Sequence, residues 1–123
     1  MKLTKTQAIE EHRKMWNWIA DETERRREPV GKYSYLKKYI YTGEGLTKYG
    51  TIKDNCFLCE YTVNQSYRNC SSCPLDWAVG ENKVRYCTES ESLFTKWYKA
   101  FAVDDWRTCA ILAREIANLK EKQ

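Results

Sequence analysis

The sequence is poor in histidine and proline, and these shortages limit the chemistry that it can perform. It has one histidine, His12, and two prolines. A single histidine leaves few ways to activate a cysteine or serine nucleophile. The zinc-deaminase signature Pro-Cys-x-x-Cys is missing, because Pro74 follows Cys73 instead of preceding a cysteine pair. Gly43 and Gly45 lack the further glycine and the Lys-Ser/Thr pair of a phosphate-binding loop. We therefore expect no active site and a protein that is not an enzyme.

Long hydrophobic runs are also missing. No stretch approaches the ~20 apolar residues of a membrane span, the mean hydropathy is −0.77, and 31% of residues are charged. The first residues lack the apolar segment of a signal peptide. We therefore expect a cytoplasmic protein with no membrane partner, in a reducing compartment where cysteine pairs favour metal over disulfides.

Cysteine is the residue type that carries a specific pattern. Two Cys-x2-Cys pairs, separated by ten residues, comprise Cys56, Cys59, Cys70 and Cys73. Each such turn can place two thiolates about 2.3 Å from one metal ion, and two turns complete a tetrahedral zinc site. Four thiolates leave no open coordination position, so the predicted zinc is structural. Two disulfides or four unrelated core cysteines are the alternatives.

Two further cysteines stand outside the pairs. Cys87 lies fourteen residues beyond Cys73 and is either a rival zinc ligand or a buried thiol. Cys109 falls on the apolar face of a predicted helix, where we expect it to serve packing. After the last ligand, the run Cys73-Pro-Leu-Asp-Trp77 predicts a rigid exit, with Trp77 able to shield the metal from water.

The rest of the chain predicts a mainly α fold of three to four helices in one domain, residues 1–123. Thr4 and Gln7 suit a capping box for a helix over 4–27 that Pro29 ends. Residues 32–41 could be strand or helix, and the spacing of their apolar side chains favours helix. A zinc-stapled irregular segment covers 56–89.

Helical periodicity returns in residues 90–123. We expect one face of Leu93, Phe94, Trp97, Tyr98 and Phe101, and then a last helix with Asp104 as N-cap. That helix has an apolar face of Trp106, Cys109, Ala110, Ala113, Ile116 and Ala117. The predicted shared core contains Trp16, Ile19, Leu93, Trp97, Trp106, Cys109 and Ile116, and the lone His12 is expected to be a satisfied core residue.

Positive charge lies mainly in the first third of the chain. Residues 1–55 carry twelve Lys or Arg against eight acids, whereas residues 56–89 carry three against four. The cysteine segment is therefore not basic, which argues against a zinc finger that grips phosphate. The candidate partner-binding residues are Trp18, Arg25, Arg26, Arg27, Lys37 and Lys38. For the arginines, a solvated helix end among glutamates is the alternative. The tyrosines of 33–41 are either core or a stacking surface.

Several of these segments resemble uncharacterised small proteins encoded by bacteriophages of Gram-positive hosts. The resemblance is carried by the run His12 to Thr23, by the two cysteine pairs with the Cys-Pro-x-Asp-Trp motif, by the aromatic segment around Trp97 and by the final Ala-rich helix. It implies activity in the cytoplasm of an infected bacterium. It carries over no functional residues beyond the cysteines.

The sequence thus predicts a zinc-stabilised binding protein of a phage. The expected partner is a host protein or a nucleotide signal, and counteracting host defence is the version that the resemblance favours. The alternative is a nucleic-acid-binding accessory or regulatory protein that uses the basic region Arg25–Lys38. The oligomeric state is not predicted.

Overall fold

The chain is mainly helical, as predicted. The structure, a computed structural model, describes residues 4–40, 57–58, 73–78, 87 and 91–121. Their elements in order are α1 (Lys5–Arg26), α2 (Lys32–Tyr35), the π-helical η1 (Leu36–Ile40), α4 (Leu93–Ala102) and α5 (Trp106–Ala117). In the part of the chain so described, no helix is both long and apolar enough to cross a membrane.

Local sequence fixes both ends of α1. The Thr4 hydroxyl accepts a hydrogen bond from the Gln7 backbone N–H, and the Gln7 side chain accepts one from the Thr4 N–H. This reciprocal capping box satisfies donors that the first turn would otherwise leave without partners. At the other end Arg27 adopts a left-handed conformation, with φ 56°, and Pro29 follows two residues later. The predicted helix and its cap are both confirmed.

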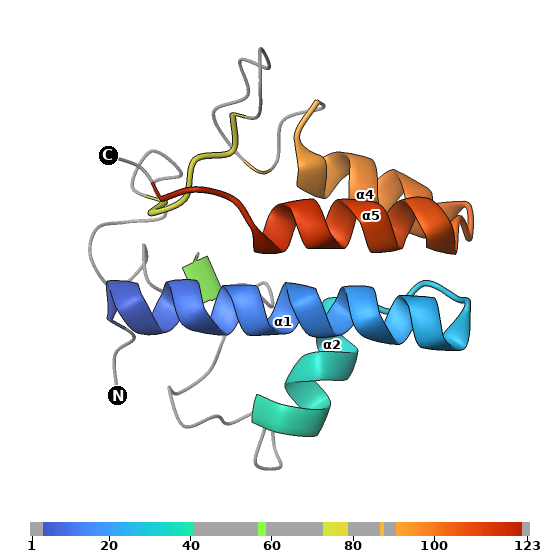
Figure 1. The fold of residues 1–123 in the computed structure, drawn as a ribbon, viewed down its shortest axis with the longest axis horizontal. Coiled ribbons are helices and arrows are strands. Elements are labelled where there is room, and N and C mark those ends of the chain that lie inside the picture. Colours follow the sequence, from blue (N-terminus) through green and yellow to red (C-terminus); the bar gives the residue numbers. More distant parts are fainter. Residues whose placement is uncertain (1–3, 41–56, 59–72, 79–86, 88–90, 122–123) are drawn as a thin grey trace.

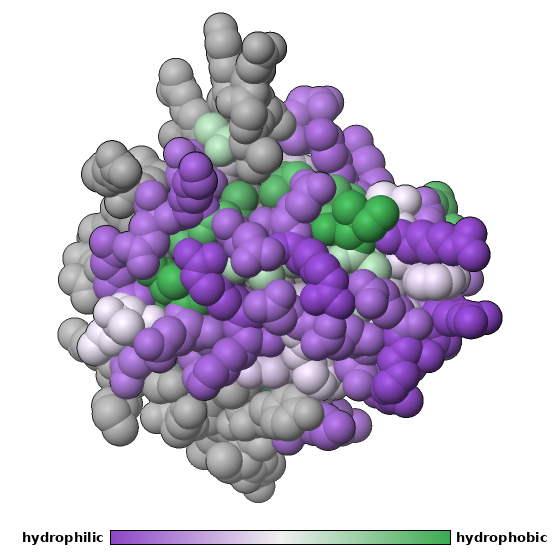
Figure 2. All heavy atoms as spheres, viewed as in Figure 1, coloured by the Kyte–Doolittle hydropathy of each residue, from purple (hydrophilic) through white to green (hydrophobic). Residues whose placement is uncertain are grey.

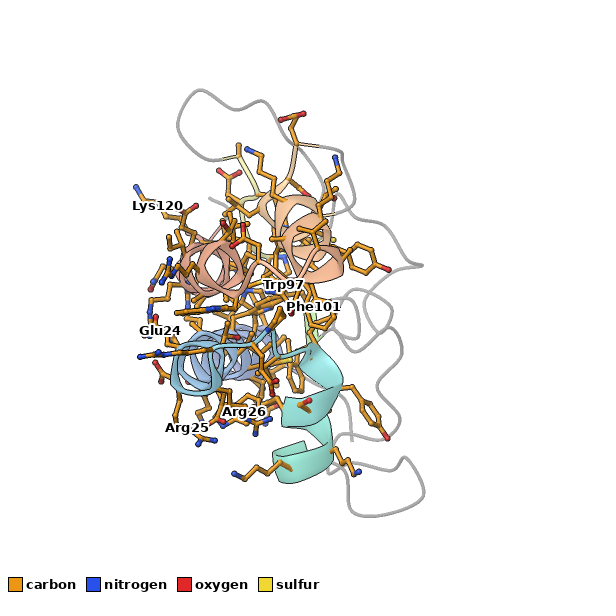
Figure 3. All side chains as sticks on the ribbon, turned by 90° about the vertical axis from the view of Figure 1, so that its right-hand side faces the viewer. Glu24, Arg25, Arg26, Trp97, Phe101 and Lys120 are labelled. Carbon is orange, nitrogen blue, oxygen red and sulfur yellow. The ribbon has the colours of Figure 1, made fainter. Side chains whose placement is uncertain are left out.

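Two layers of helices make up the described part of the molecule. Figure 1 shows α5 lying alongside α1 with the opposite chain direction, and the end view of Figure 3 places α4 and α2 on the other side of this pair. The α1–α5 interface is the most extensive between elements, followed by that of α4 with α5. The long first helix thus packs against the last one, which joins the two ends of the sequence.

Aromatic rings fill the space between the helices. Trp16 on α1 meets Trp97 on α4 edge to face, with ring centroids 4.9 Å apart, and Phe94 packs on both of them. Six of the seven predicted core residues are buried here: Trp16, Ile19, Leu93, Trp97, Cys109 and Ile116. The seventh prediction, Trp106, is wrong, because this side chain is only partly buried and lies outside the core cluster.

Residues 32–40 are helical, which settles the choice between helix and strand. Tyr35 and Leu36 face the core, and two contacts join this segment to α4. Lys32 Nζ lies 4.6 Å from the centre of the Phe94 ring. A Cβ atom at Gly31 would lie 3.7 Å from Phe101 Cε2, so Phe101 covers the start of α2.

The start of α5 differs from the prediction by one residue. Asp105, not Asp104, is the N-cap: its carboxylate accepts hydrogen bonds from the Thr108 backbone N–H and hydroxyl. These bonds lower the pKa of Asp105. Asp104 instead takes a left-handed conformation, φ 60°, that closes the turn after α4. An Asp-Asp pair supports both roles, so the local sequence did not separate them.

Candidate functional site

The segment after the second cysteine pair is anchored in the core. Cys73 is partly buried, whereas Leu75 and Trp77 are 0% and 4% exposed. The Asp76 backbone N–H donates to the Lys120 carbonyl at 2.8 Å, and Leu75 and Glu121 form an isolated antiparallel bridge. The exit from the predicted knuckle is therefore held against the C-terminal end of the chain, as Figure 1 shows.

The first cysteine pair is anchored through the two residues between its cysteines. Phe57 and Leu58 are 0% and 1% exposed and belong to the same core cluster as Leu75 and Trp77. Phe57 and Leu58 adjoin Cys56 and Cys59, and the buried Pro74 adjoins Cys73. Residues next to three of the four predicted ligands are therefore buried, as a closed structural metal site requires.

The zinc site itself stays a prediction. Cys56, Cys59 and Cys70 lie outside the described residues, and only Cys73 of the four lies within them. Among the described side chains there is no group of three that could hold a metal ion. The structure thus shows where residues beside the cysteines lie, but it does not show the geometry of the four ligands.

His12 is a buried residue with a hydrogen-bond partner, as predicted, and it lies in the interface between α1 and α5. Its Nε2 donates to the Ile116 carbonyl at 3.0 Å, and its ring meets Trp77 edge-on with centroids 6.3 Å apart. Burial lowers the pKa of His12 to about 4, against the hydrogen bond to Ile116, which raises it. The imidazole is thus neutral at pH 7, and a proton on Nε2 makes the bond to the carbonyl.

The neighbouring Arg13 also binds a backbone carbonyl at the C-terminus of α5. Its guanidinium donates to the Ala117 carbonyl at 2.7 Å. The last carbonyls of a helix lack partners within the helix and carry partial negative charge, so a cation there stabilises the helix end. His12 and Arg13 therefore bind the last carbonyls of α5, and both have a structural role.

The Cys109 thiol is not activated as a nucleophile. Cys109 is 0% exposed, and its thiol lies 3.9 Å from the Trp97 carbonyl. Burial, with the charges of Asp105 and Asp104, raises the pKa of Cys109 to about 11, so it is protonated at neutral pH. The packing role predicted for Cys109 is confirmed. Cys87 is partly buried, and its carbonyl accepts a hydrogen bond from the Ser92 hydroxyl at 2.5 Å.

The arginine run predicted to bind a partner is largely engaged within α1. Arg25 and Arg26 both donate to Glu22, at 2.6 and 2.9 Å, and these bonds lower the pKa of Glu22 to about 2. Figure 3 shows the two arginines on the side of α1 away from α5. Arg27 is exposed at the C-cap.

Two acids of α1, Asp21 and Glu24, pair with a cation of α5. Arg114 of α5 donates to Asp21 at 2.6 Å and to Glu24 at 3.1 Å. Figure 2 shows this face, formed mainly by α1 and α5, as largely hydrophilic. Exposed pairs of this kind contribute little to stability, roughly 0–1 kcal/mol each, but they cancel charge locally.

The remaining predicted partner-binding residues divide in two groups. Trp18 is partly buried and packs on Tyr35, with ring centroids 5.6 Å apart. Helix α2 thus supplies the surface against which this side chain packs. Lys37 and Lys38 are exposed on η1. Tyr35 is core, whereas Tyr33 is 57% exposed; whether Tyr33 forms a stacking surface stays a prediction.

Sequence reasoning missed an exposed group on α4. The five aromatic and apolar residues predicted to form one face separate in the structure: Leu93 and Trp97 are buried, but Tyr98 is 62% and Phe101 38% exposed. Helical spacing could have shown this, because Tyr98 lies about 140° around the helix from Leu93. An aromatic and apolar face that spans about 140° of α4 is wider than the strip that one neighbouring helix covers.

The described residues define a mainly helical protein whose first and last helices pair around an aromatic core, with the predicted zinc knuckle adjoining that core. Comparison with protein families, with curated proteins and with solved structures finds no match to this chain.

Proposed function

We propose that the protein acts by binding, not by catalysis, and that zinc stabilises its fold. The state of His12 carries this proposal. A general base must reach the proton that it abstracts and have a pKa near the working pH. His12 is 2% exposed, bonded to a backbone carbonyl, and has a pKa of about 4. The sole histidine is thus committed to joining α1 and α5.

Zinc enters the proposal as a structural component. The supporting observation is the burial of Phe57, Leu58 and Leu75 beside the predicted ligands. A metal held by Cys56, Cys59, Cys70 and Cys73 would link the two anchored segments, and this would restrict the chain between them. Such a knuckle supports the helical body and leaves the contact surface to the helices.

The biological setting rests on the resemblance to phage proteins. We propose a phage protein of the infected cytoplasm that engages a host protein or a nucleotide signal and counteracts host defence. Arg27, Lys37 and Lys38 are exposed members of the predicted binding set, and we propose that their cationic groups meet an anionic partner.

Affinity purification from the host tests this proposal. Wild-type protein should retain a partner that mass spectrometry identifies, whether protein or small molecule. A variant with Arg27, Lys37 and Lys38 changed to Glu should lose it and keep its melting temperature. Changing the exposed Lys5, Lys14 and Lys120 to Glu alters the net charge equally and should leave binding intact. Turnover of the captured partner, abolished by substitution of one residue, would contradict the non-enzymatic proposal.

A second candidate function, nucleic-acid binding, is favoured by one observation. Exposed lysines on η1 and α4 are accompanied by the exposed Tyr33 of α2 and Tyr98 of α4. Aromatic side chains and cations in alternation are typical of surfaces that hold single strands.

A further inference from the structure

A band of lysines and tyrosines crosses from η1 and α2 to α4. We call it the Lys–Tyr band, and its residues are Lys37, Tyr33, Lys32, Tyr98 and Lys99. Both tyrosines are more than half exposed, at 57% and 62%. Lys37 and Lys99 are exposed, and Lys32 is partly buried. Each half of the band thus carries an exposed tyrosine ring and an exposed ammonium group, Tyr33 with Lys37 and Tyr98 with Lys99.

Two contacts hold the halves of the band together. Lys32 Nζ lies over the Phe94 ring at 4.6 Å, and Phe101 packs against Gly31. Figure 3 shows Phe101 at the junction of α4 with α2. Tyr98 is one helical turn from both Phe94 and Phe101, at spacings of four and three residues, so it lies beside this junction on the outer side of α4. Its neighbour Lys99 lies about 100° further around the helix.

The charge of the band has one sign. Neither Lys32–Ile40 nor Leu93–Ala102 contains an acidic residue, and the nearest acids along the chain, such as Glu28 and Asp104, lie outside these elements. Among the described residues, Lys37 and Lys99 form no ion pair. The arginines of α1 and α5 differ, because Glu22, Asp21 and Glu24 pair with them.

We propose that the Lys–Tyr band binds single-stranded nucleic acid, with phosphates at the lysines and bases stacked on Tyr33 and Tyr98. Any base offers a flat face to a tyrosine ring, and lysine meets phosphate as a point charge. Lysine is depleted from the centres of protein–protein interfaces, so the composition favours a phosphate chain over an acidic protein. A duplex keeps its bases stacked inside and offers nothing to the exposed rings. This inference rests on the proposal that the helical body acts by binding.

Fluorescence anisotropy with labelled 20-nucleotide single strands of DNA and of RNA tests it, using the whole protein. With three lysines in contact, the logarithm of the association constant should fall with that of salt concentration with a slope of about −2. Tyr33→Ala and Tyr98→Ala should each weaken binding roughly fivefold or more, because each removes one stacking platform. Tyr98→Phe should bind as wild type does, since stacking needs the ring and not the hydroxyl.

Matched controls separate the band from general positive charge. Lys99→Ala should weaken binding and reduce the steepness of the salt slope by about 0.7. Lys120→Ala, an exposed lysine after α5 that Figure 3 places on the side of the molecule away from α2, should do neither. Ile111→Ala removes another side chain that is 62% exposed, on α5, and should leave affinity unchanged.

Four results would overturn the inference. The first is no binding of single strands at 50 mM salt, and the second is equal effects of Lys120→Ala and Lys99→Ala. The third is unchanged affinity in both tyrosine-to-alanine variants, and the fourth is equal or tighter binding of a duplex or of polyglutamate. If the strand is bound at the band but is also cut, the band stands and the non-enzymatic proposal fails. If the strand is neither bound nor cut, only the inference about the band fails.

Discussion

His12 illustrates how a single buried side chain sets the response of the molecule to acid. The unfolded chain binds a proton at this residue with a pKa near 6.5, whereas burial lowers the pKa in the folded state to about 4. Between these values the unfolded chain binds more protons, so acid favours unfolding. The contribution of His12 to stability is complete above pH 6.5 and is lost as the pH falls to 4.

We predict that the wild-type protein loses about 3 kcal/mol of unfolding free energy between pH 7 and pH 4 through His12. Urea unfolding at closely spaced pH values measures this loss. His12→Gln should be less stable at pH 7 but should show a flatter dependence over the same interval. Glu22, whose pKa is about 2 in the folded state, acts in a lower range, below pH 4.5. A wild-type stability that is constant from pH 6.5 to 4.5 would contradict the assignment.

The tryptophans offer a second test at the residue scale. Trp97 is 4% exposed and contacts rings from α1 and α4, so Trp97→Ala should lower the unfolding free energy by roughly 3–5 kcal/mol. Trp106 is only partly buried and has Arg107 over its ring at 5.2 Å. Trp106→Ala should therefore cause a clearly smaller loss in the same urea experiment. Equal losses would show that Trp106 belongs to the core after all.

Among the helices, the start of α5 provides a prediction with an internal control. Removing the Asp105 carboxylate in Asp105→Ala exposes the first turn, which should cost about 1 kcal/mol. Asp104→Gly should be neutral or stabilising, because glycine adopts a left-handed φ of 60° without strain. Thermal unfolding of both variants distinguishes them. A larger loss for the Asp104 variant would restore Asp104 as the cap.

The helices were predictable because their signals are local. The capping box of Thr4 with Gln7, the break at Pro29 and the three- and four-residue spacing of buried side chains all lie within one element. The pairing of Arg25 and Arg26 with Glu22 is local too, at three and four residues, and was visible as an interleaved charge run. What the sequence did not reveal are contacts between distant residues: His12 and Arg13 at the end of α5, and Arg114 with Asp21 and Glu24.

In the cysteine segment, too, the local pattern was predictable and the contacts with distant residues were not. Spacing alone predicts the metal ligands, but nothing in the spacing indicates that Phe57 and Leu58 enter the core. Their burial depends on apolar surface supplied by elements far away in the sequence. The exposure of Tyr98 was missed for a related reason, because the part of a wide aromatic face that stays uncovered depends on its neighbours.

At the scale of the whole molecule, a succession of ring contacts joins the segment after Cys73 to the helices. Trp77, four residues after Cys73, contacts His12, which contacts Trp16, which contacts Trp97. The last ring, Trp97, contacts Phe101 at the junction of α4 and α2. Loosening the exit of the knuckle should therefore change the environment of Trp77 first, and with it the packing of His12 between α1 and α5.

We predict that protein purified without chelator contains one zinc ion per chain, and that its removal loosens the knuckle while the helices persist in part. Structural zinc stabilises small zinc peptides by ~10 kcal/mol or more. Chelation should thus lower the melting temperature markedly and shift tryptophan emission to the red as Trp77 meets water. The helical circular dichroism should fall only partly, because residues of the α1–α5 interface, Ile19 and Ile116 among them, are buried without help from the metal.

Single substitutions assign the ligands of this zinc. Cys56→Ser, Cys59→Ser, Cys70→Ser and Cys73→Ser should each release the metal and reproduce the effect of the chelator. Cys109→Ser is the matched control, since Cys109 packs between α5 and α4 and should keep the zinc content at one. Cys87→Ser decides the remaining choice: if it loses zinc while one of the four other variants retains it, Cys87 is a ligand in place of that residue. Less than half an equivalent of zinc in the wild-type protein would exclude the metal site, and the anchored segments would then be held by their apolar contacts alone.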